Sequence, residues 1–165
     1  MKEVSAGTRM ELTVLHSPLV YGPGAPGNFG ALVRAVRHGW PLPFGKVTQN
    51  RRSFVAVDNL VDLIVTCLDH PAAANQTFLV SDGEDLSTAD LLCRLGVAMG
   101  RPARLLPVPI SWLASGARLL HKQVMFQSLC GSLQADISQT RERLGGSPPI
   151  DVDEGLKRAV RGALC

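Results

Sequence analysis

Short extended runs alternate with helical runs along the chain. Brief runs of β-branched and apolar residues predict strands, and apolar residues repeated every three or four positions predict helices. The alternation of the two is typical of an α/β protein. We expect strands at 11–15, 52–57 and 77–80, and helices at 29–36, 58–68, 87–99, 110–120, 138–144 and from 151 onward.

Three of these helices carry recognisable start signals. Asp58 is predicted to cap the helix that follows it, and the apolar residues in Leu60–Leu68 are expected to form a broad buried stripe. The segments Ser87–Asp90 and Asp151–Glu154 each have the spacing of a capping box. We therefore expect well-defined helix starts at these places.

Composition and charge exclude several classes of protein. Hydrophobic residues make up 45% of the chain and charged residues 19%, which is typical of a globular domain. The net charge of +3 is scattered, so a nucleic-acid partner is not expected. No apolar run approaches the roughly 18 residues needed to span a bilayer, and no membrane partner is expected. The four cysteines include no Cys-x-x-Cys pair, and the histidines are dispersed; these features favour reduced thiols, a cytoplasmic location and no metal site.

Six segments are similar, in order and spacing, to one known family. The chain resembles the extended short-chain dehydrogenases, which are NAD-dependent nucleotide-sugar epimerases and dehydratases. The resemblance implies an α/β fold: the C-terminal part of an NAD(P)-binding Rossmann-like enzyme, with a partial sheet and a small, mostly helical substrate-binding region. It assigns residues 1–101 to the end of the sheet with substrate-binding insertions and 102–165 to the helical region. The segments that carry it are Leu15–Gly24, Pro41–Gly45, Asn50–Leu60, Phe78–Glu84, Gly131–Asp136 and Leu144–Gly145.

The catalytic and cofactor motifs of that family are not found in this sequence. Its dinucleotide loop is a Gly-rich turn between a strand and a helix, whereas the turn here contains Pro23 and Pro26, which have no amide donor. The family's base is a Tyr followed four residues later by Lys, but the single tyrosine, Tyr21, is followed by Ala25. Family order would put the Tyr/Lys pair before Met1, with residues 2–6 as the tail of that helix. We therefore expect the C-terminal half of a longer enzyme, with no catalytic residue of its own, in which NAD is bound by the intact protein and not by this chain alone.

The resemblance also implies a set of substrate-binding residues. Arg52 is the expected diphosphate contact, because a guanidinium matches phosphate geometry; the alternative is a surface or ion-paired arginine. Asn28 is expected to contact the phosphates through its amide, with a helix N-cap as the alternative. Leu42 and Phe44 flank the expected position of the pyrimidine base, or else they form a hydrophobic plug. Ser128 stands where relatives often carry an arginine that reaches the ribose or phosphate.

Other polar residues near the predicted strand ends receive weaker assignments. Ser17 and Pro18 resemble the segment that meets the nicotinamide ring, although His16 and Ser17 replace the usual Arg-Pro. His16 has the chemistry of an acid or base, but no predicted partner stands next to it. Asp82 and Asp136 are interpreted as turn and cap residues rather than ligands.

Two function classes remain on the sequence alone. The first is the substrate-binding half of an epimerase or dehydratase, which binds a nucleoside-diphosphate sugar, most simply a uridine diphosphate (UDP) sugar, without turning it over. The second is a non-catalytic interaction or oligomerisation module, or a truncated remnant, whose exposed apolar face drives homo-oligomer formation. Ligand binding by a monomer favours the first, and ligand-independent oligomers favour the second.

Overall fold

Two small sheets form the centre of the molecule. A computed structural model describes residues 11–161. In one sheet β1 pairs in parallel with β4; in the other β2 pairs in parallel with β3, and β5 joins β3 in the antiparallel sense. The strands are β1 (Val14–His16), β2 (Leu19–Tyr21), β3 (Arg52–Ala56), β4 (Thr77–Leu79) and β5 (Asp85–Leu86).

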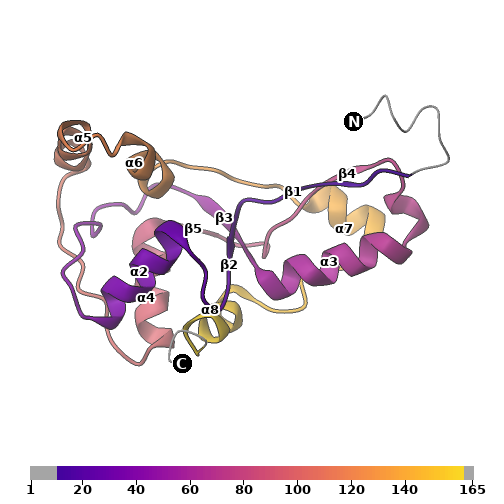
Figure 1. Cartoon of the computed structure of the whole chain (residues 1–165), viewed down its shortest axis with the longest axis horizontal. Helices are drawn as coiled ribbons and strands as arrows, with labels where there is room; N and C mark the ends of the chain where they lie inside the picture. The colour runs from indigo at the N-terminus through magenta and orange to yellow at the C-terminus, as the bar shows by residue number, and fades with distance from the viewer. Residues whose placement is uncertain (1–10, 162–165) are drawn as a thin grey trace.

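Helices surround both sheets, and the whole is a mixed α/β fold, as the sequence predicts. Figure 1 shows α2, α4 and α8 grouped around the β2–β3 sheet, α3 and α7 beside β1 and β4, and α5 and α6 at the opposite end. The helices are α2 (Gly27–Arg37), α3 (Val57–Asp69), α4 (Thr88–Ala98), α5 (Ile110–Leu119), α6 (Gln123–Cys130), α7 (Ser138–Leu144) and α8 (Val152–Arg161), with a 3-10 turn η1 (Pro71–Ala73).

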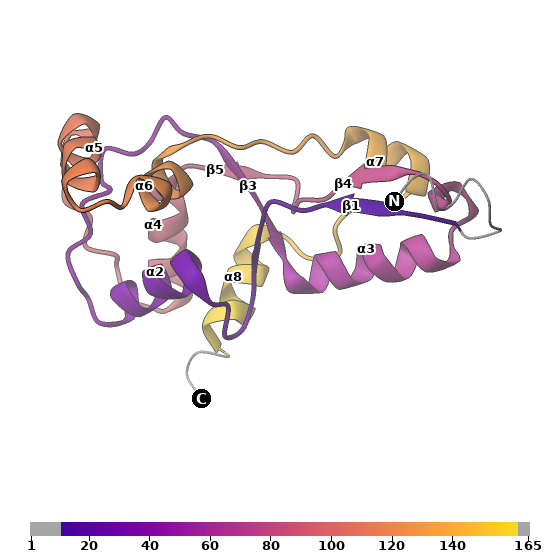
Figure 2. The same ribbon diagram turned by 45° about the horizontal axis from the view of Figure 1, so that its top comes forward.

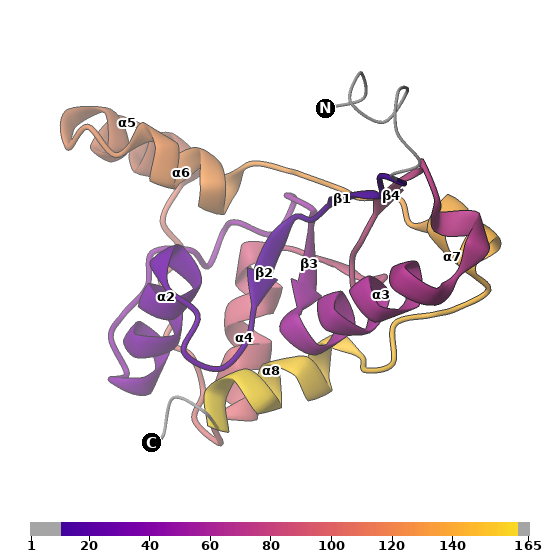
Figure 3. The same ribbon diagram turned by 45° about the vertical axis from the view of Figure 1, so that its right-hand side comes forward.

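The larger hydrophobic core lies where β2, β3, α2, α4 and α8 meet. Tyr21 at its centre is 1% exposed and packs its ring against Phe29, with ring centroids 5.4 Å apart. Leu92 of α4 and Leu156 of α8 are fully buried in the same cluster. Figure 3 shows α8 crossing below α4 and the β2–β3 sheet. This core fixes the position of the β3 end that carries Arg52.

A much smaller core lies under α3. Its buried members are Ala73, Phe78 and Leu144, with Leu63 and Cys67 of α3 packed at its edge. Figure 2 shows α3 running along one side of the β1–β4 pair and α7 along the other. Because this sheet has only two strands, it can cover little of the length of α3.

Most predicted elements are present, and α3 is the main correction. The capping box at Ser87–Asp90 forms as expected at the start of α4. Asp58, however, lies inside the first turn of α3 and does not cap it; Ala56 occupies the N-cap without a side-chain bond. The expected buried stripe is also wrong, since Val61 is 53% and Leu68 79% exposed. No element among residues 11–161 packs on that face, so the apolar pattern has no partner there.

Two further findings concern the remaining helices. Helix α6 was not among the predicted elements, because its apolar residues do not mark a single continuous face. Within residues 11–161, no helix is both long enough and apolar enough to cross a membrane. The predicted helix tail at residues 2–6 lies outside the described residues.

Candidate functional site

The start of β3 meets the segment that follows α6. The backbone of Ser53 donates to Leu133 O at 2.8 Å, and that of Leu133 donates to Arg51 O at 2.9 Å. This pairing sets Arg52 against the C-terminal turn of α6, where its Nη1 donates to Gly131 O at 3.2 Å. The guanidinium is therefore positioned by backbone hydrogen bonds at the start of β3 and by a backbone carbonyl at the end of α6.

The charge of Arg52 has no counter-ion among residues 11–161, because none of the ion pairs within that range includes it. Its Nε is buried and has no hydrogen-bond partner in the same part of the chain. Burial lowers the pKa of Arg52 below the usual arginine value, but a guanidinium remains charged at neutral pH. A guanidinium that has no counter-ion and whose buried Nε–H has no acceptor favours binding of an anion such as a phosphate. The ion-paired alternative is therefore wrong for the described residues, and as a surface arginine Arg52 is only partly exposed.

Asn28 and Ser128 lie together beside the same helix end. The Asn28 side-chain amide donates to Ser128 Oγ at 3.1 Å, which joins the first turn of α2 to α6 across 100 residues of sequence. The N-cap alternative for Asn28 is wrong, since Pro26 is the N-cap of α2 and makes no side-chain bond. Helix α2 thus begins with Asn28 turned toward α6, and α6 carries contacts to both Asn28 and Arg52.

A buried amide that received no role in the sequence analysis holds this region together. Asn50 is 6% exposed and precedes Arg52 by two residues. Its Nδ2 donates to Thr88 Oγ1 at 3.1 Å and to Leu129 O at 3.2 Å, and its Oδ1 accepts from Thr88 N at 3.2 Å. Asn50 therefore joins the start of α4 to the end of α6. The only sequence signal was its place in one of the family-like segments.

An apolar groove of about 270 Å³ runs beside the cluster. Phe44 lines it from the Pro-rich segment, opposite Phe126 and Leu129 of α6. Leu42 has a different role. Its backbone is hydrogen-bonded to Arg104 and Leu106 of a neighbouring segment, and its side chain packs against the larger core. The structure thus brings Asn28, Ser128, Arg52 and Phe44 around α6, with Leu42 behind the groove wall.

Ser17 and Pro18, the residues assigned to the cofactor side, directly precede β2. They form the link between β1 and β2, so they stand at the junction of the two sheets. Ser17 is exposed, and within residues 11–161 no hydrogen bond connects it to the cluster around Arg52. Because Leu19 pairs with Phe54 in the parallel β2–β3 ladder, Ser17 and Arg52 each come two residues before a paired position, and both stand at the same end of this sheet.

Tyr21 and Asp82 form a buried network that sequence reasoning missed. Tyr21 Oη donates to Asp82 Oδ2 at 2.7 Å, while Asp82 Oδ1 accepts from Ala56 N at 2.9 Å and from Asn59 Nδ2 at 2.7 Å. Burial raises the pKa of Tyr21 well above the ordinary phenol value, and the Asp82 charge adds to the rise. Burial also raises the pKa of the Asp82 carboxyl, against the opposing effect of these hydrogen bonds. The phenol is thus held protonated and cannot act as a base.

Two other expectations concern caps and metals. Asp136 accepts from Ser138 N at 2.9 Å in a local turn before α7, but it is not the N-cap, which is Ile137 without a side-chain bond. Across residues 11–161, no group of three His, Cys, Asp or Glu side chains is placed to hold a metal ion. The chemistry of the region is therefore that of cation, amide and apolar contacts.

Two curated proteins are similar to this chain in sequence. No family model matches the chain. A UDP-glucose 4-epimerase of Vibrio cholerae is 50% identical over 155 residues, which cover 94% of this chain and 47% of the relative. An uncharacterized protein of Sinorhizobium fredii is 25% identical and covers 96% of the chain and 49% of that protein. The chain therefore spans about half the length of the curated relatives that it matches.

Solved structures show the same fold. A UDP-glucose 4-epimerase from Thermotoga maritima, solved with UDP-glucose, superposes with a TM-score of 0.71 at 19% identity, over 99% of this chain and 49% of that one. A UDP-glucuronic acid 4-epimerase from Bacillus cereus, solved with NAD, gives a TM-score of 0.70 at 18% identity, over 98% of this chain and 46% of the other. The chain is thus similar in sequence to the C-terminal half of a UDP-glucose 4-epimerase and shares the fold of solved 4-epimerases, in agreement with the resemblance seen in the sequence.

Proposed function

We propose that this chain is the substrate-binding half of a UDP-glucose 4-epimerase-like protein and binds a nucleoside-diphosphate sugar, with a UDP-sugar as the first choice. The observation that carries the proposal is Arg52: a half-buried guanidinium without a counter-ion, with a buried and unpaired Nε. A diphosphate supplies the charge and the acceptors that this side chain lacks. The relative from Vibrio cholerae and the UDP-glucose complex of the Thermotoga maritima enzyme support the choice of ligand.

The surrounding residues have complementary roles in the proposal. Asn28 donates its amide to a phosphate oxygen in exchange for its present bond to Ser128. Phe44 offers an apolar wall for the pyrimidine ring, and Leu42 supports that wall from behind. Since Ser128 brings no charge, Arg52 is the only cation assigned to the ligand, and binding by this chain is expected to be weak.

The division of labour along the chain is part of the same proposal. Residues 1–101 supply the end of a Rossmann-like sheet together with Asn28, Phe44 and Arg52, and residues 102–165 supply the helical cover that includes Ser128. Leu156 of α8 is buried in the larger core with residues of the first segment. The two segments therefore share one core, while they contribute different sides of the ligand site.

We propose that the turn after β2 does not hold the pyrophosphate of NAD. In the turn after β2, Pro23 and Pro26 have no amide hydrogen, and the amide of Ala25 is bonded to Gly22 O at 3.2 Å. A Cβ at Gly30 would stand 2.3 Å from Ala25 O, so this glycine serves close packing within the turn. We propose that Ser17 and Pro18 approach a nicotinamide only where another part of the intact protein holds the dinucleotide.

We propose that the tyrosine at the centre of the described residues does not serve as the base that turnover requires. Deprotonation of a sugar hydroxyl calls for a group whose pKa lies near the working pH, whereas burial keeps Tyr21 protonated and Asp82 holds its hydroxyl. We therefore expect the chain to bind ligand without epimerising it. Conversion of UDP-glucose to UDP-galactose by the purified chain with added NAD would contradict this part of the proposal.

Calorimetric titration with UDP-glucose tests the binding proposal directly. Replacing Arg52 by Gln removes the charge while keeping a hydrogen-bonding side chain, and we expect the Kd to rise about tenfold or more because charge-assisted bonds to the diphosphate are lost. Arg52→Lys keeps the charge and should retain part of the affinity. The matched control is Arg51→Gln, since Arg51 is exposed and its guanidinium bonds only backbone oxygens of Thr48 and Asn50.

Two results would contradict the binding proposal. The first is equal affinity of the native chain and Arg52→Gln for UDP-glucose, which would place the ligand elsewhere. The second is equal loss in Arg51→Gln and Arg52→Gln, which would indicate a general charge effect. Titration with uridine and with inorganic phosphate then separates the contributions of the base and the diphosphate.

One observation favours the second candidate function, an interaction or oligomerisation module. Along α3, large apolar side chains are exposed, among them Val61 at 53%, Val65 at 52% and Leu68 at 79%. A contiguous apolar face of this kind is typical of a protein contact surface. This candidate needs no ligand, and it predicts self-association that nucleotide sugars do not alter.

A further inference from the structure

The hairpin formed by α5 and α6 is the most exposed apolar part of the molecule. Neither helix contains a buried residue, and residues 118–125, which span the end of α5, the turn at 120–122 and the start of α6, are all exposed. Leu119 and Val124 are each 82% exposed, and Trp112 is 73% exposed. Trp112 and Leu119 are seven residues apart, so they share one face of α5. Large apolar side chains near the turn are thus exposed to solvent instead of packed against the body of the protein.

The stretch of sequence that contains this hairpin carries charges of one sign only. From Leu91 to Ala135 the sequence has no Asp or Glu, while it contains Arg94, Arg101, Arg104, Arg118 and Lys122. Arg118 and Lys122 flank the exposed turn, and His121 stands beside them. Within residues 11–161 neither of these two cations takes part in an ion pair.

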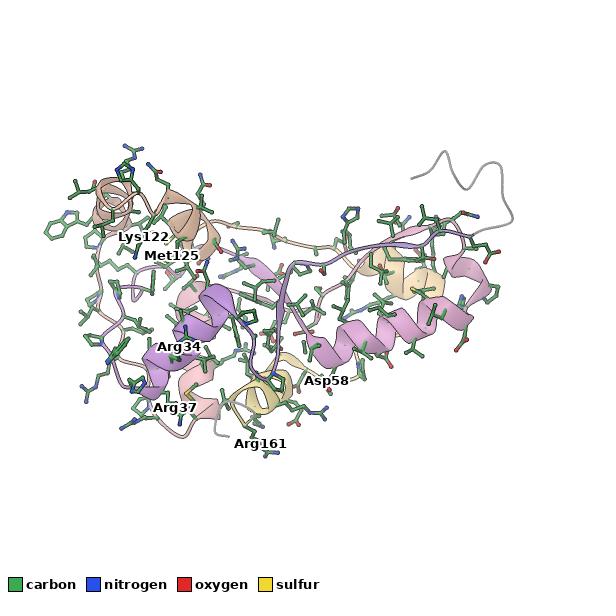
Figure 4. All side chains as sticks on the ribbon, viewed as in Figure 1. Arg34, Arg37, Asp58, Lys122, Met125 and Arg161 are labelled. Atoms are coloured by element: carbon green, nitrogen blue, oxygen red, sulfur yellow. The ribbon has the colours of Figure 1, made fainter. Side chains whose placement is uncertain are left out.

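The hairpin is also placed to reach a flat surface. Figure 3 shows α5 and α6 projecting from one corner of the molecule, and Figure 4 places Lys122 and Met125 at the end opposite α3. The two helices pack mainly against each other. No other described element therefore blocks the approach of a flat surface to the exposed side of α5 and α6.

We propose that the α5–α6 hairpin docks on an anionic lipid surface, with Trp112, Leu119 and Val124 inserted at the interface and Arg118 and Lys122 on the headgroups. Tryptophan favours the membrane–water interface, apolar residues beside cations characterise helices that lie in that plane, and each cation near an anionic surface strengthens binding about fivefold. A second copy of the chain fits less well, because two such hairpins would bring like charges together.

This docking does not conflict with the absence of a spanning helix among residues 11–161. The sequence-based expectation of no membrane partner rested on the lack of a long apolar run, and run length tests whether a segment spans a bilayer. Surface docking depends instead on exposed apolar area and on charge. None of the docking residues bonds the Arg52 guanidinium, but Trp112 and Lys122 also line the apolar groove beside Phe44, so docking would restrict access to that groove.

Co-sedimentation of the full chain with vesicles tests the proposal. We expect binding to vesicles of phosphatidylcholine and phosphatidylglycerol in equal parts, little binding to phosphatidylcholine alone, and weakening as salt screens the cations. In a Trp40→Phe background, where Trp112 is the single tryptophan, its emission should shift to shorter wavelength on binding. Leu119→Gln with Val124→Gln should weaken binding about tenfold or more, and Arg118→Glu with Lys122→Glu should abolish it.

The matched control is Leu68→Gln with Val97→Gln, which replaces the same residue types at 79% and 80% exposure on α3 and α4. All four positions are exposed, so both double variants should fold, which circular dichroism checks. Equal vesicle binding by the two double variants would overturn the proposal, as would no binding of the native chain to anionic vesicles. Self-association in the absence of lipid that only the Leu119/Val124 variant loses would overturn it as well, and would assign the hairpin to a second copy.

Discussion

Helices α3 and α8 make a useful comparison, because their burial is the reverse of what their compositions suggest. Helix α3 is rich in Val, Leu and Ile, yet its single buried residue is Asn59. Helix α8 is rich in charged residues, yet it buries Val152, Leu156 and Val160. A helix with few apolar residues on one correct face is thus better packed than one with many.

The difference lies in what each helix meets. Helix α8 contacts α4, β2 and β3, so its apolar face closes the larger core. Helix α3 also contacts β2 and β3, besides η1, but its apolar side chains reach only the small core, through inner residues such as Leu63 and Cys67. Parallel sheets are usually covered on both faces and extended by further strands. The exposed side of α3 is therefore available for a protein contact, as the second candidate function requires.

The largest expected effect separates the two helices by stability. Leu156→Ala should lower the free energy of unfolding by about 2–5 kcal/mol, because the side chain is fully buried and its removal leaves a cavity. Leu68→Ala, its counterpart on α3, is 79% exposed and should change stability by less than about 0.5 kcal/mol. Urea unfolding measures both. Equal losses would mean that α3 is packed in solution.

A smaller effect is expected where the two helices are joined. Asp82 accepts from Asn59 of α3 and from Tyr21, whose hydroxyl lies 3.4 Å from Val152 O at the start of α8. Burial raises the pKa of Asp82 in the folded chain. The folded carboxyl therefore keeps its proton to a higher pH than the unfolded one, so Asp82 favours folding at low pH. That contribution is lost as pH rises above about 4, the unfolded value, and through the folded pKa.

Asp82→Asn tests this sign. The new amide keeps an acceptor for Ala56 N and Asn59, and Tyr21 can donate to Val152 O instead. We expect the native chain to lose stability relative to the variant as pH rises above about 4, by less than the loss at Leu156 because no volume is removed. Urea unfolding at a series of pH values measures the difference. Parallel curves, or a native chain that gains on the variant as pH rises, would show that the buried carboxyl is not destabilised by ionisation.

The smallest effect on stability is expected on the exposed side of α3. Val61→Lys with Val65→Lys should change the free energy of unfolding by less than about 0.5 kcal/mol, because both side chains are about half exposed and Lys is a better helix former than Val. Light scattering should show any self-association of the native chain reduced in the variant. A loss of stability as large as that of Leu156→Ala would instead place this side of α3 in a packed core.

Local elements were largely predictable. The capping box of α4, the bounds of α7 and the start of β3 follow from short-range patterns. Arg52, Asn28 and Ser128 were singled out by family resemblance, and the structure gathers them around α6. The burial of α3 was mispredicted. An apolar face shows which side of a helix can be buried, but it does not show whether another element packs on that side.

The sequence by itself determined the α/β class, most helix and strand positions and the family likeness, since these depend on side-chain periodicity and on motifs that a few neighbouring residues define. Only the tertiary structure decided that Tyr21 bonds Asp82, 61 residues away, and that Arg52 meets Gly131, 79 residues away. It also decided which apolar faces are covered. Contacts of this range depend on how complete elements pack, and no local pattern of residues encodes the neighbour that each element will find.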